Sequence, residues 1–338
     1  MRITLCLAFL MSAALAANSK INPLSDEFIN HINSQQNDWK AGRNFDKNIP
    51  ISEIKKRLGG LKSLSKSKSK PTVHSEDIEI PESFDARTHW PECSKVINDI
   101  VDQSNCGSCW AVSAASVMSD RRCIASGGSL QVPVSAEDVI SCCHTCIIFE
   151  NGCQGSYPEL AFDYWFEKGV VTGGQYNSSL GCKPYALQPC DRPSVVDGKY
   201  VQCSTLPEVT EKKCMRSCST SGLNYKSELT YGKSKRERFA TVEDVQREIL
   251  QNGPVVAYLT VFEDFLSYKS GVYYHVAGKE AGGHVIRIIG WGTENNVAYW
   301  IAANSWNDEW GDAGLFKIRR GVNECAIEEN IYAAQPKL

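Results

Sequence analysis

A cysteine at the start of a predicted helix is the first residue whose setting could support chemistry. Cys109 follows Cys106-Gly107-Ser108 and precedes Trp110 and a run of small residues. The glycine and serine end a turn, Ser108 can cap the helix, and Cys109 falls in its first turn. Because the helix dipole favours negative charge there, we expect the pKa of the thiol, about 8.5 in a free cysteine, to be lowered. The thiolate is the reactive form, so Cys109 is a candidate nucleophile.

A nucleophilic cysteine needs a base, and the chain has six histidines. His284 lies between Gly282-Gly283 and a strand-like run, so the glycines allow close backbone approach and the strand provides a rigid mount. The others lie in the N-terminal segment or lack such a setting, and we expect ordinary histidines at His31, His74, His89, His144 and His275.

An amide beside two tryptophans is the candidate for orienting the base. Asn304 stands in the run Asn304-Ser305-Trp306-Asn307-Asp308-Glu309-Trp310-Gly311. Its side-chain carbonyl can accept from the imidazole N–H and hold one tautomer without adding charge. One of the tryptophans could cover that bond from solvent.

The same cysteines permit two other interpretations. Cys106 and Cys109 could form a thiol–disulfide redox pair, or half of a zinc site whose other half is Cys143-His144-Thr145-Cys146. The redox motif is typical of a βαβ context, and cysteines in an oxidising compartment form disulfides rather than zinc sites. We therefore favour the nucleophile and expect no metal and no cofactor.

The start of the chain has the layout of a cleaved secretory signal. Arg2 precedes an apolar run from Ile3 to Leu15. The small residues around Ala16 predict a cut after Ala16, which would remove residues 1–16 as a signal peptide. No other stretch is apolar enough for stable membrane insertion. The net charge of -3 gives no excess of basic residues of the kind that binds nucleic acid. Fourteen cysteines remain after cleavage and predict a disulfide framework whose connectivity spacing alone cannot fix.

The remaining chain divides into a short N-terminal segment and a larger module. Residues 17–60 have apolar residues at helical spacing. From Lys55 to Lys70 there are seven basic residues and no acidic ones, which predicts a flexible, protease-accessible linker rather than a nucleic-acid or heparin patch. Beyond about Ile80, a helix-containing, cysteine-rich part precedes a part with short strands, an α+β arrangement with a cleft between lobes. The clearest predicted elements are helices over 110–122 and 157–168 and strands over 255–261, 284–290, 299–303 and 315–319.

Together these motifs resemble the papain-like cysteine peptidases. Cys109, His284 and Asn304 correspond to the catalytic triad of that family, and Gln103 to the glutamine that completes the oxyanion hole with the Cys109 N–H. The resemblance implies a papain-like two-lobed fold, with a helical lobe over about 90–235 and a β-rich lobe over about 236–338.

The distance between nucleophile and base points to the cathepsin B type. His284 lies 175 residues after Cys109, whereas the generic spacing is about 130–150 residues. The surplus fits the cysteine-rich insertion 182–218, which resembles the occluding loop of cathepsin B. The run from Trp39 to Phe45 resembles its propeptide motif. By this resemblance residues 17–79 run backward through the cleft as an inhibitor, and cleavage near Ile80 releases a peptidase domain over 80–338.

The resemblance also implies a disulfide pattern that uses 12 of the 14 cysteines. The pairs are Cys93–Cys123, Cys106–Cys153, Cys142–Cys214, Cys143–Cys146, Cys182–Cys218 and Cys190–Cys203. Cys109 and Cys325 remain, and we expect Cys325 to be buried and inert.

Family subsites carry over to five positions, which are Gly155, Ser156, Gly283, Trp306 and Asn330. Ser156 replaces one of two glycines that line the substrate backbone, with little expected consequence. Asn330 replaces a glutamate that forms the floor of the pocket for the second residue before the cut. A neutral floor should favour hydrophobic side chains over arginine, unless Glu329 reaches in.

A further departure concerns the occluding loop. Between Cys190 and Cys203 there is no histidine, whereas cathepsin B uses two to hold a substrate's terminal carboxylate. We expect internal cleavage to dominate and dipeptide removal to be weak or absent, although Arg192 or Lys199 could substitute in part. The alternative is an inactive secreted scaffold that binds a protein partner. Glycosylation is expected at Asn177, and a monomer in a lysosomal, endosomal or extracellular location.

Overall fold

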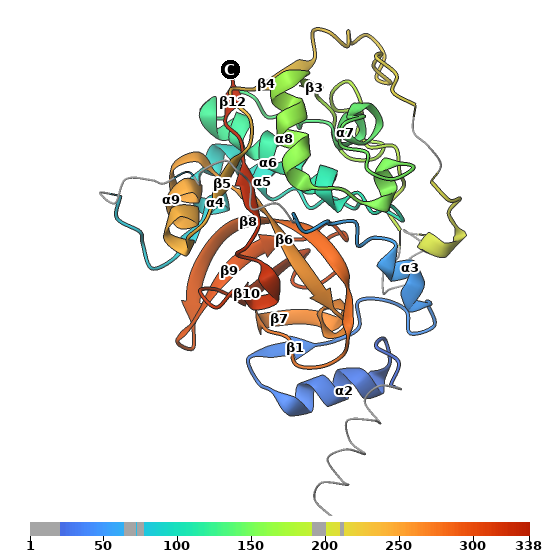
Figure 1. Cartoon of the computed structure of the whole chain (residues 1–338), viewed down its shortest axis with the longest axis vertical. Helices are drawn as coiled ribbons and strands as arrows, with labels where there is room; N and C mark the ends of the chain where they lie inside the picture. Colours follow the sequence, from blue (N-terminus) through green and yellow to red (C-terminus); the bar gives the residue numbers. More distant parts are fainter. Residues whose placement is uncertain (1–20, 64–71, 73–77, 191–200, 210–212) are drawn as a thin grey trace, which may run out of the picture.

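Two lobes and an N-terminal segment make up the structure, a computed structural model that describes residues 21–63, 72, 78–190, 201–209 and 213–338. Figure 1 shows the green and cyan helices above the orange and red strands. The blue N-terminal segment (residues 21–63) passes beneath the strands and then up along one side of them. The expected α+β fold with a helical and a β-rich lobe is confirmed.

The helical lobe is built around α6 (Cys109–Ala125), which is buried along almost its whole length. Its small side chains let α7, α8 and the strand β8 (Glu280–Glu294) pack closely against it. The bounds of the α-helices in the larger module are α4 Ala86–His89, α5 Ser94–Ile97, α6 Cys109–Ala125, α7 Ala136–Cys142, α8 Pro158–Glu167 and α9 Val242–Asn252.

The β-rich lobe is a strongly connected sheet in the order β1-β7-β10-β9-β8-β6-β11-β5, with β2 also paired to β8. Its long central strands carry apolar residues on both faces, which suits strands that are buried on both sides. Helices cover one face of the sheet and aromatic side chains pack on the other. The strands are β1 Trp39–Ala41, β2 Phe84–Asp85, β5 Glu237–Phe239, β6 Val255–Phe262, β7 Tyr268–Tyr273, β8 Glu280–Glu294, β9 Val297–Ala303, β10 Leu315–Arg319 and β11 Ile331–Ala333.

The two ends of the larger module cross between the lobes. Near its start, β2 pairs antiparallel with β8 of the β-rich lobe. At its end, β12 (Pro336–Lys337) returns to the helical lobe and pairs with β4 (Leu229–Gly232), which also pairs with β3 (Val170–Val171). The crossed ends therefore tie the two lobes together.

A buried ion pair adds a second link between the lobes. Arg287 on β8 contacts both carboxylate oxygens of Asp120 on α6, at 2.8 and 2.6 Å. The same guanidinium donates to the main-chain carbonyls of Ile97 and Asp99. Because the strand of Arg287 also carries His284, this pair fixes that strand against the helix that begins at Cys109.

The N-terminal segment joins the sheet as an extra edge. It contains α2 (Asp26–Gln35), capped by the Ser25 side chain, then β1, which pairs with β7, and the short α3 (Ile51–Lys55). Its Trp39 is buried, and the indole N–H donates to the Tyr274 carbonyl. The segment is therefore packed on the larger module like a part of it.

The predicted helices and strands are confirmed, with small differences at their ends. The helix predicted over 110–122 begins one residue earlier and ends three later, and the strand predicted over 284–290 extends to 280–294. The periodicity of apolar residues along the sequence did not predict α9 or β1. Within the described ranges, every helix falls short of the length and apolar character that a membrane crossing requires.

Candidate active site

Cys109 is the first residue of α6 and is fully buried. The preceding Ser108 occupies the N-cap position, but its side chain makes no capping bond. Its hydroxyl instead lies 2.8 Å from the hydroxyl of Tyr185, which donates to the Gln103 carbonyl. The expected capping role of Ser108 is therefore wrong, and its hydroxyl instead links the helix start to the Gln103 turn.

The base lies on β8, and its orienting amide directly follows the end of the neighbouring strand β9. His284 Nε2 is 2.8 Å from Asn304 Oδ1, and this oxygen also accepts from the Ser305 N–H. Trp306 covers the pair, with its ring centroid 4.8 Å from that of His284, and Trp310 packs at right angles on Trp306. The other ring nitrogen, Nδ1, is buried and has no hydrogen-bond partner among the described residues. It is therefore the nitrogen left to exchange a proton with a thiol.

Gln103 is held so that its amide nitrogen points into the cleft. Its Oε1 accepts from the Ser305 hydroxyl at 2.7 Å, and its Nε2 donates to the Cys106 carbonyl at 2.6 Å. A further bond from Nε2 reaches the main-chain carbonyl of Arg57 at 2.8 Å. A carbonyl oxygen therefore already occupies the position at which an oxyanion would be stabilised.

The N-terminal segment lies directly across the catalytic residues. Gly60 N donates to the Gly283 carbonyl, Leu61 N to the Ser156 carbonyl, and Ser156 N to the Gly59 carbonyl, each at 3.0 Å. The bridge between Gly60 and Ser156 is parallel. The segment therefore makes the main-chain bonds of a bound peptide on both walls of the cleft.

Two glycines allow this close approach. A Cβ on Gly59 would lie 1.7 Å from the Gly107 carbonyl oxygen, and a Cβ on Gly60 would lie 2.6–2.8 Å from the main chain of His284. Each contact is with backbone, which cannot rotate away. The path that the propeptide takes over Cys109 and His284 therefore requires glycine at both positions.

The expected subsite residues lie along the same path. Gly155 has a φ of 104°, which favours glycine, and a Cβ there would lie 2.8 Å from the Gly59 carbonyl oxygen. The Ser156 hydroxyl turns away from the cleft and donates to the Cys146 carbonyl at 2.5 Å. Gly283 leaves room for the Gly60 carbonyl. The extra hydroxyl at position 156 therefore does not obstruct the substrate path.

Burial sets the charge state of the catalytic pair in this form. Desolvation raises the pKa of the Cys109 thiol to about 12, although main-chain N–H groups of Val285 and Gly59 oppose the shift. Desolvation also lowers the pKa of His284 to about 4, against the opposing effect of its bond to Asn304. Thiol and imidazole are both neutral here, so the expected lowering of the Cys109 pKa is wrong for this form. The predicted lowering applies to a Cys109 that water can reach, whereas here the N-terminal segment covers it.

Asn330 lies beside the cleft, immediately before β11. Its side chain is buried, and its Oδ1 is 3.4 Å from the Tyr332 hydroxyl. Glu329 points elsewhere, because its carboxylate pairs with Lys62 of the N-terminal segment at 2.7 Å in a half-exposed position. In this form the acidic neighbour of Asn330 is thus a rim residue.

Disulfides account for the cysteines that the zinc and redox interpretations would use. The described residues contain the six pairs implied by the resemblance, which are Cys93–Cys123, Cys106–Cys153, Cys142–Cys214, Cys143–Cys146, Cys182–Cys218 and Cys190–Cys203. Cys106 is therefore not the partner of Cys109, and the Cys143 motif is not half of a zinc site. No group of three metal-ligating side chains occurs in the part of the chain that the structure describes.

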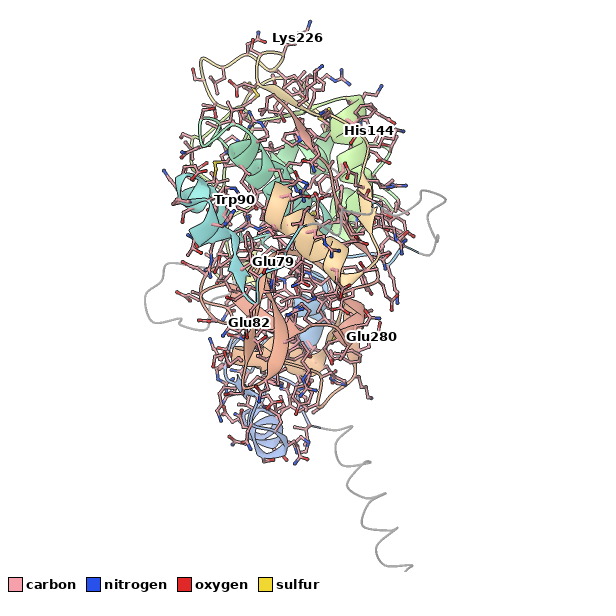
Figure 2. All side chains as sticks on the ribbon, turned by 90° about the vertical axis from the view of Figure 1, so that its left-hand side faces the viewer. Glu79, Glu82, Trp90, His144, Lys226 and Glu280 are labelled. Carbon is pink, nitrogen blue, oxygen red and sulfur yellow. A yellow bond between two sulfur atoms is a disulfide. The ribbon has the colours of Figure 1, made fainter. Side chains whose placement is uncertain are left out.

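The partners of Cys325, His275 and His89 are residues other than the catalytic ones. Cys325 as a residue is partly exposed, so the expectation that it is buried is wrong. Its thiol is nevertheless largely desolvated, which raises the pKa of the thiol. His275 contacts the Asp264 carboxylate, His89 packs on Trp90, and His144 lies on the surface in Figure 2. His74 lies outside the described residues.

The basic stretch is more ordered than its composition predicts. Residues 55–63 form the end of α3 and the strand-like chain in the cleft, so the predicted flexible linker is wrong for this part. Arg57 is buried against the sulfurs of Cys190 and Cys203. The loop between these cysteines that carries Arg192 and Lys199, residues 191–200, lies outside the described residues.

Sequence reasoning did not identify the residues that hold Gln103 and the start of α6. Ser305 was visible only as a neighbour of Asn304, and Tyr185 lies 76 residues after Cys109. The carbonyl of Arg57 could not be predicted because it is a main-chain group. These contacts depend on the folded path of the chain rather than on local spacing.

Comparison with known proteins agrees with this geometry. Residues 80–335 match the papain family cysteine protease domain, and residues 24–63 match the peptidase family C1 propeptide. The chain belongs to the papain family of cysteine peptidases. The N-terminal segment is thus the propeptide of this papain-family chain, and the whole is a zymogen.

Several relatives that the chain resembles over nearly its whole length are of the cathepsin B type. The chain is 45% identical to cathepsin B-like cysteine proteinase 5 of Caenorhabditis elegans, over 92% of this chain and 90% of that protein. It is 43% identical to a cathepsin B-like cysteine proteinase of Schistosoma japonicum, over 94% and 92%. Procathepsin B S9 of Trypanosoma congolense has a similar structure, with a TM-score of 0.79 and 35% identity over 94% of this chain and 99% of that one.

Proposed function

We propose that the chain enters the secretory pathway, loses residues 1–16 as a signal, and is activated by removal of residues 17–79. The mature domain, residues 80–338, then acts as a cysteine endopeptidase on proteins and peptides, as a monomer without metal or cofactor. The observation that carries this proposal is the arrangement of Cys109, His284, Asn304 and Gln103 beneath a peptide-like main chain.

The proposed reaction is acyl transfer. Once the cleft is open to water, the Cys109 thiol passes its proton to His284, and the thiolate attacks the carbonyl carbon of the scissile bond. Gln103 Nε2 and the Cys109 N–H stabilise the oxyanion, and the His284 imidazolium protonates the leaving amine. Water then attacks the thioester, His284 takes its proton, and the thiolate leaves. Asn304 keeps the ring in one tautomer throughout.

Substrate positioning is proposed for the main-chain groups that now hold the propeptide. Gly155, Ser156 and Gly283 would bind a substrate's main chain, and Trp306 would line the side beyond the cut. This is supported by the bonds that Gly59, Gly60 and Leu61 make with the same walls.

Activation requires a cut near Ile80. Exposed residues surround this point, and Figure 2 shows Glu79 and Glu82 with their side chains on the surface. The exposed Asn177, with a φ of 57° in a turn, is accessible as the proposed glycosylation site. These features suit a lysosomal, endosomal or extracellular destination.

Endopeptidase rather than dipeptidyl activity is proposed from the lack of histidine between Cys190 and Cys203. The test compares two peptides of the same sequence, one with a free and one with an amidated C-terminus. We expect similar cleavage rates at internal bonds. Faster release of dipeptides from the free C-terminus would contradict the proposal, and no cleavage of either peptide would favour the scaffold alternative.

A further inference from the structure

A buried carboxylate that the catalytic mechanism does not use lies on the wall of the cleft. Glu159 is the second residue of α8, and only 5% of its surface is exposed. Its Oε2 is buried and has no hydrogen-bond partner among the described residues. A buried carboxylate oxygen without a partner is costly, so it points to a ligand that is absent in this form.

The position of Glu159 is linked to the pocket of Asn330 by contacts. The Ser63 side chain hydrogen-bonds to Glu159 and also to Tyr332. The Tyr332 hydroxyl lies 3.4 Å from Asn330 Oδ1. Glu159, Tyr332 and Asn330 are therefore joined by one chain of contacts that includes Ser63 of the propeptide.

The propeptide shows that this pocket belongs to the peptide path. From Gly59 over Cys109, the chain passes Gly283 and Ser156 and reaches Glu159 with Ser63. Removal of the propeptide takes the Ser63 hydroxyl away. A substrate side chain then takes its place beside the carboxylate.

The charged side chains near Glu159 do not neutralise the negative charge of its carboxylate. Arg236 is the nearby cation, but it already pairs with Asp163 at 3.0 Å. The three side chains together carry one net negative charge. Burial raises the pKa of Glu159, while its own backbone N–H, Arg236 and Ser63 oppose the shift and Asp163 adds to it. The phenol of Tyr332 completes the polar surroundings.

We infer that Glu159 supplies the negative charge that Asn330 does not, so that the pocket for the second residue before the cut accepts a basic side chain. This inference rests on the proposed peptidase function. It runs against the expectation of a hydrophobic preference, which considered only Asn330 and its neighbour Glu329 as sources of charge. A guanidinium would satisfy the free carboxylate oxygen by a charge-assisted hydrogen bond.

The test uses three blocked dipeptide amides with arginine before the cut and arginine, citrulline or phenylalanine as the preceding residue. Citrulline has the shape of arginine without its charge, so the ratio of kcat/KM for the two reports charge alone. We expect the mature wild-type enzyme to favour arginine over citrulline by about tenfold or more. The ratio should decrease at acidic pH as Glu159 becomes protonated.

Two variants assign the charge to a residue. In Glu159→Gln we expect the arginine-to-citrulline ratio to fall to about one, with the phenylalanine peptide still cleaved. In the control Glu329→Gln the ratio should remain, because Glu329 lies at the rim. Each ratio is measured within one preparation, so a lower yield of folded variant does not affect it.

Three outcomes would overturn the inference. They are a wild-type ratio near one, a ratio that survives in Glu159→Gln, and a ratio that is lost in Glu329→Gln. Failure of the wild-type enzyme to cleave any of the three peptides would instead contradict the proposed function, and with it this inference.

Discussion

The side-chain nitrogen of Gln103 donates a hydrogen bond to the main-chain carbonyl of Arg57 over 2.8 Å. The propeptide thus places a carbonyl where a substrate's would be activated. The Cys109 sulfur also accepts a hydrogen bond from the main-chain N–H of Gly59. Inhibition therefore combines occupation of the oxyanion position with a main-chain hydrogen bond to the nucleophile itself.

The close contact at Gly60 predicts how latency can be weakened. Gly60→Ala places a Cβ against the main chain of His284, and such overpacking costs about 1–3 kcal/mol. We expect the variant zymogen to convert to mature enzyme about five- to a hundredfold faster, measured by gel at fixed pH. Gly42→Ala is the control, because its Cβ meets only the Lys269 side chain. Equal conversion rates for Gly60→Ala and wild type would contradict this account.

The shifted pKa of Cys109 predicts a pH profile for alkylation of the intact zymogen. With a pKa of about 12, the thiolate fraction at neutral pH is on the order of one in 10⁵ and rises tenfold per pH unit. A short pulse of iodoacetamide should therefore label Cys109 slowly between pH 5 and 8, with a rate that increases with pH. In the mature enzyme the rate should be high and nearly flat over this range. A zymogen profile that matches the mature one would refute the buried neutral pair.

Ser305 is predicted to act through Gln103. Its hydroxyl holds Gln103 Oε1 at 2.7 Å, so Ser305→Ala frees the amide to rotate away from the oxyanion. We expect kcat to fall about tenfold with KM little changed, whereas Gln103→Ala should lower kcat about 10²–10³-fold. Ser116→Ala, which removes only a bond to Val112 in α6, serves as the control. An unchanged kcat in Ser305→Ala would exclude the positioning role.

The buried pair Asp120–Arg287 is predicted to hold the two lobes in register. Asp120→Ala leaves a buried guanidinium without its main partner and should reduce the free energy of unfolding by about 3–5 kcal/mol. Urea denaturation of the zymogen measures this loss. The exposed pair Lys235–Glu167 provides the comparison, since Lys235→Ala should leave the free energy of unfolding nearly unchanged. Similar losses in both variants would argue against a special role for the buried pair.

Much of the fold and of the catalytic arrangement could be predicted because local signals were strong. The run before Cys109 fixed a turn and a helix start, and the glycines before His284 marked a strand next to a close approach. The state of Cys109 could not be predicted in the same way. Its pKa depends on burial in a form in which Gly59, distant in sequence, lies over it.

The role of Glu159 shows the same limit. In the sequence it is an acidic residue in the first turn of a helix, a common and unremarkable position. Only the fold brings it next to Tyr332 and Ser63 and removes it from water. The composition of residues 55–63 likewise predicted disorder, because the main-chain bonds that order this stretch come from the opposite walls of the cleft.

The central claim is that Cys109 is the single nucleophile of the enzyme once the propeptide has left. The most direct measurement is titration of the mature enzyme with a thiol-reactive epoxide, followed by peptide mapping. We predict one label per molecule, located on Cys109, with activity falling in parallel to zero and Cys325 unlabelled. Activity that survives full labelling of Cys109, or inactivation that follows labelling of Cys325, would contradict the account.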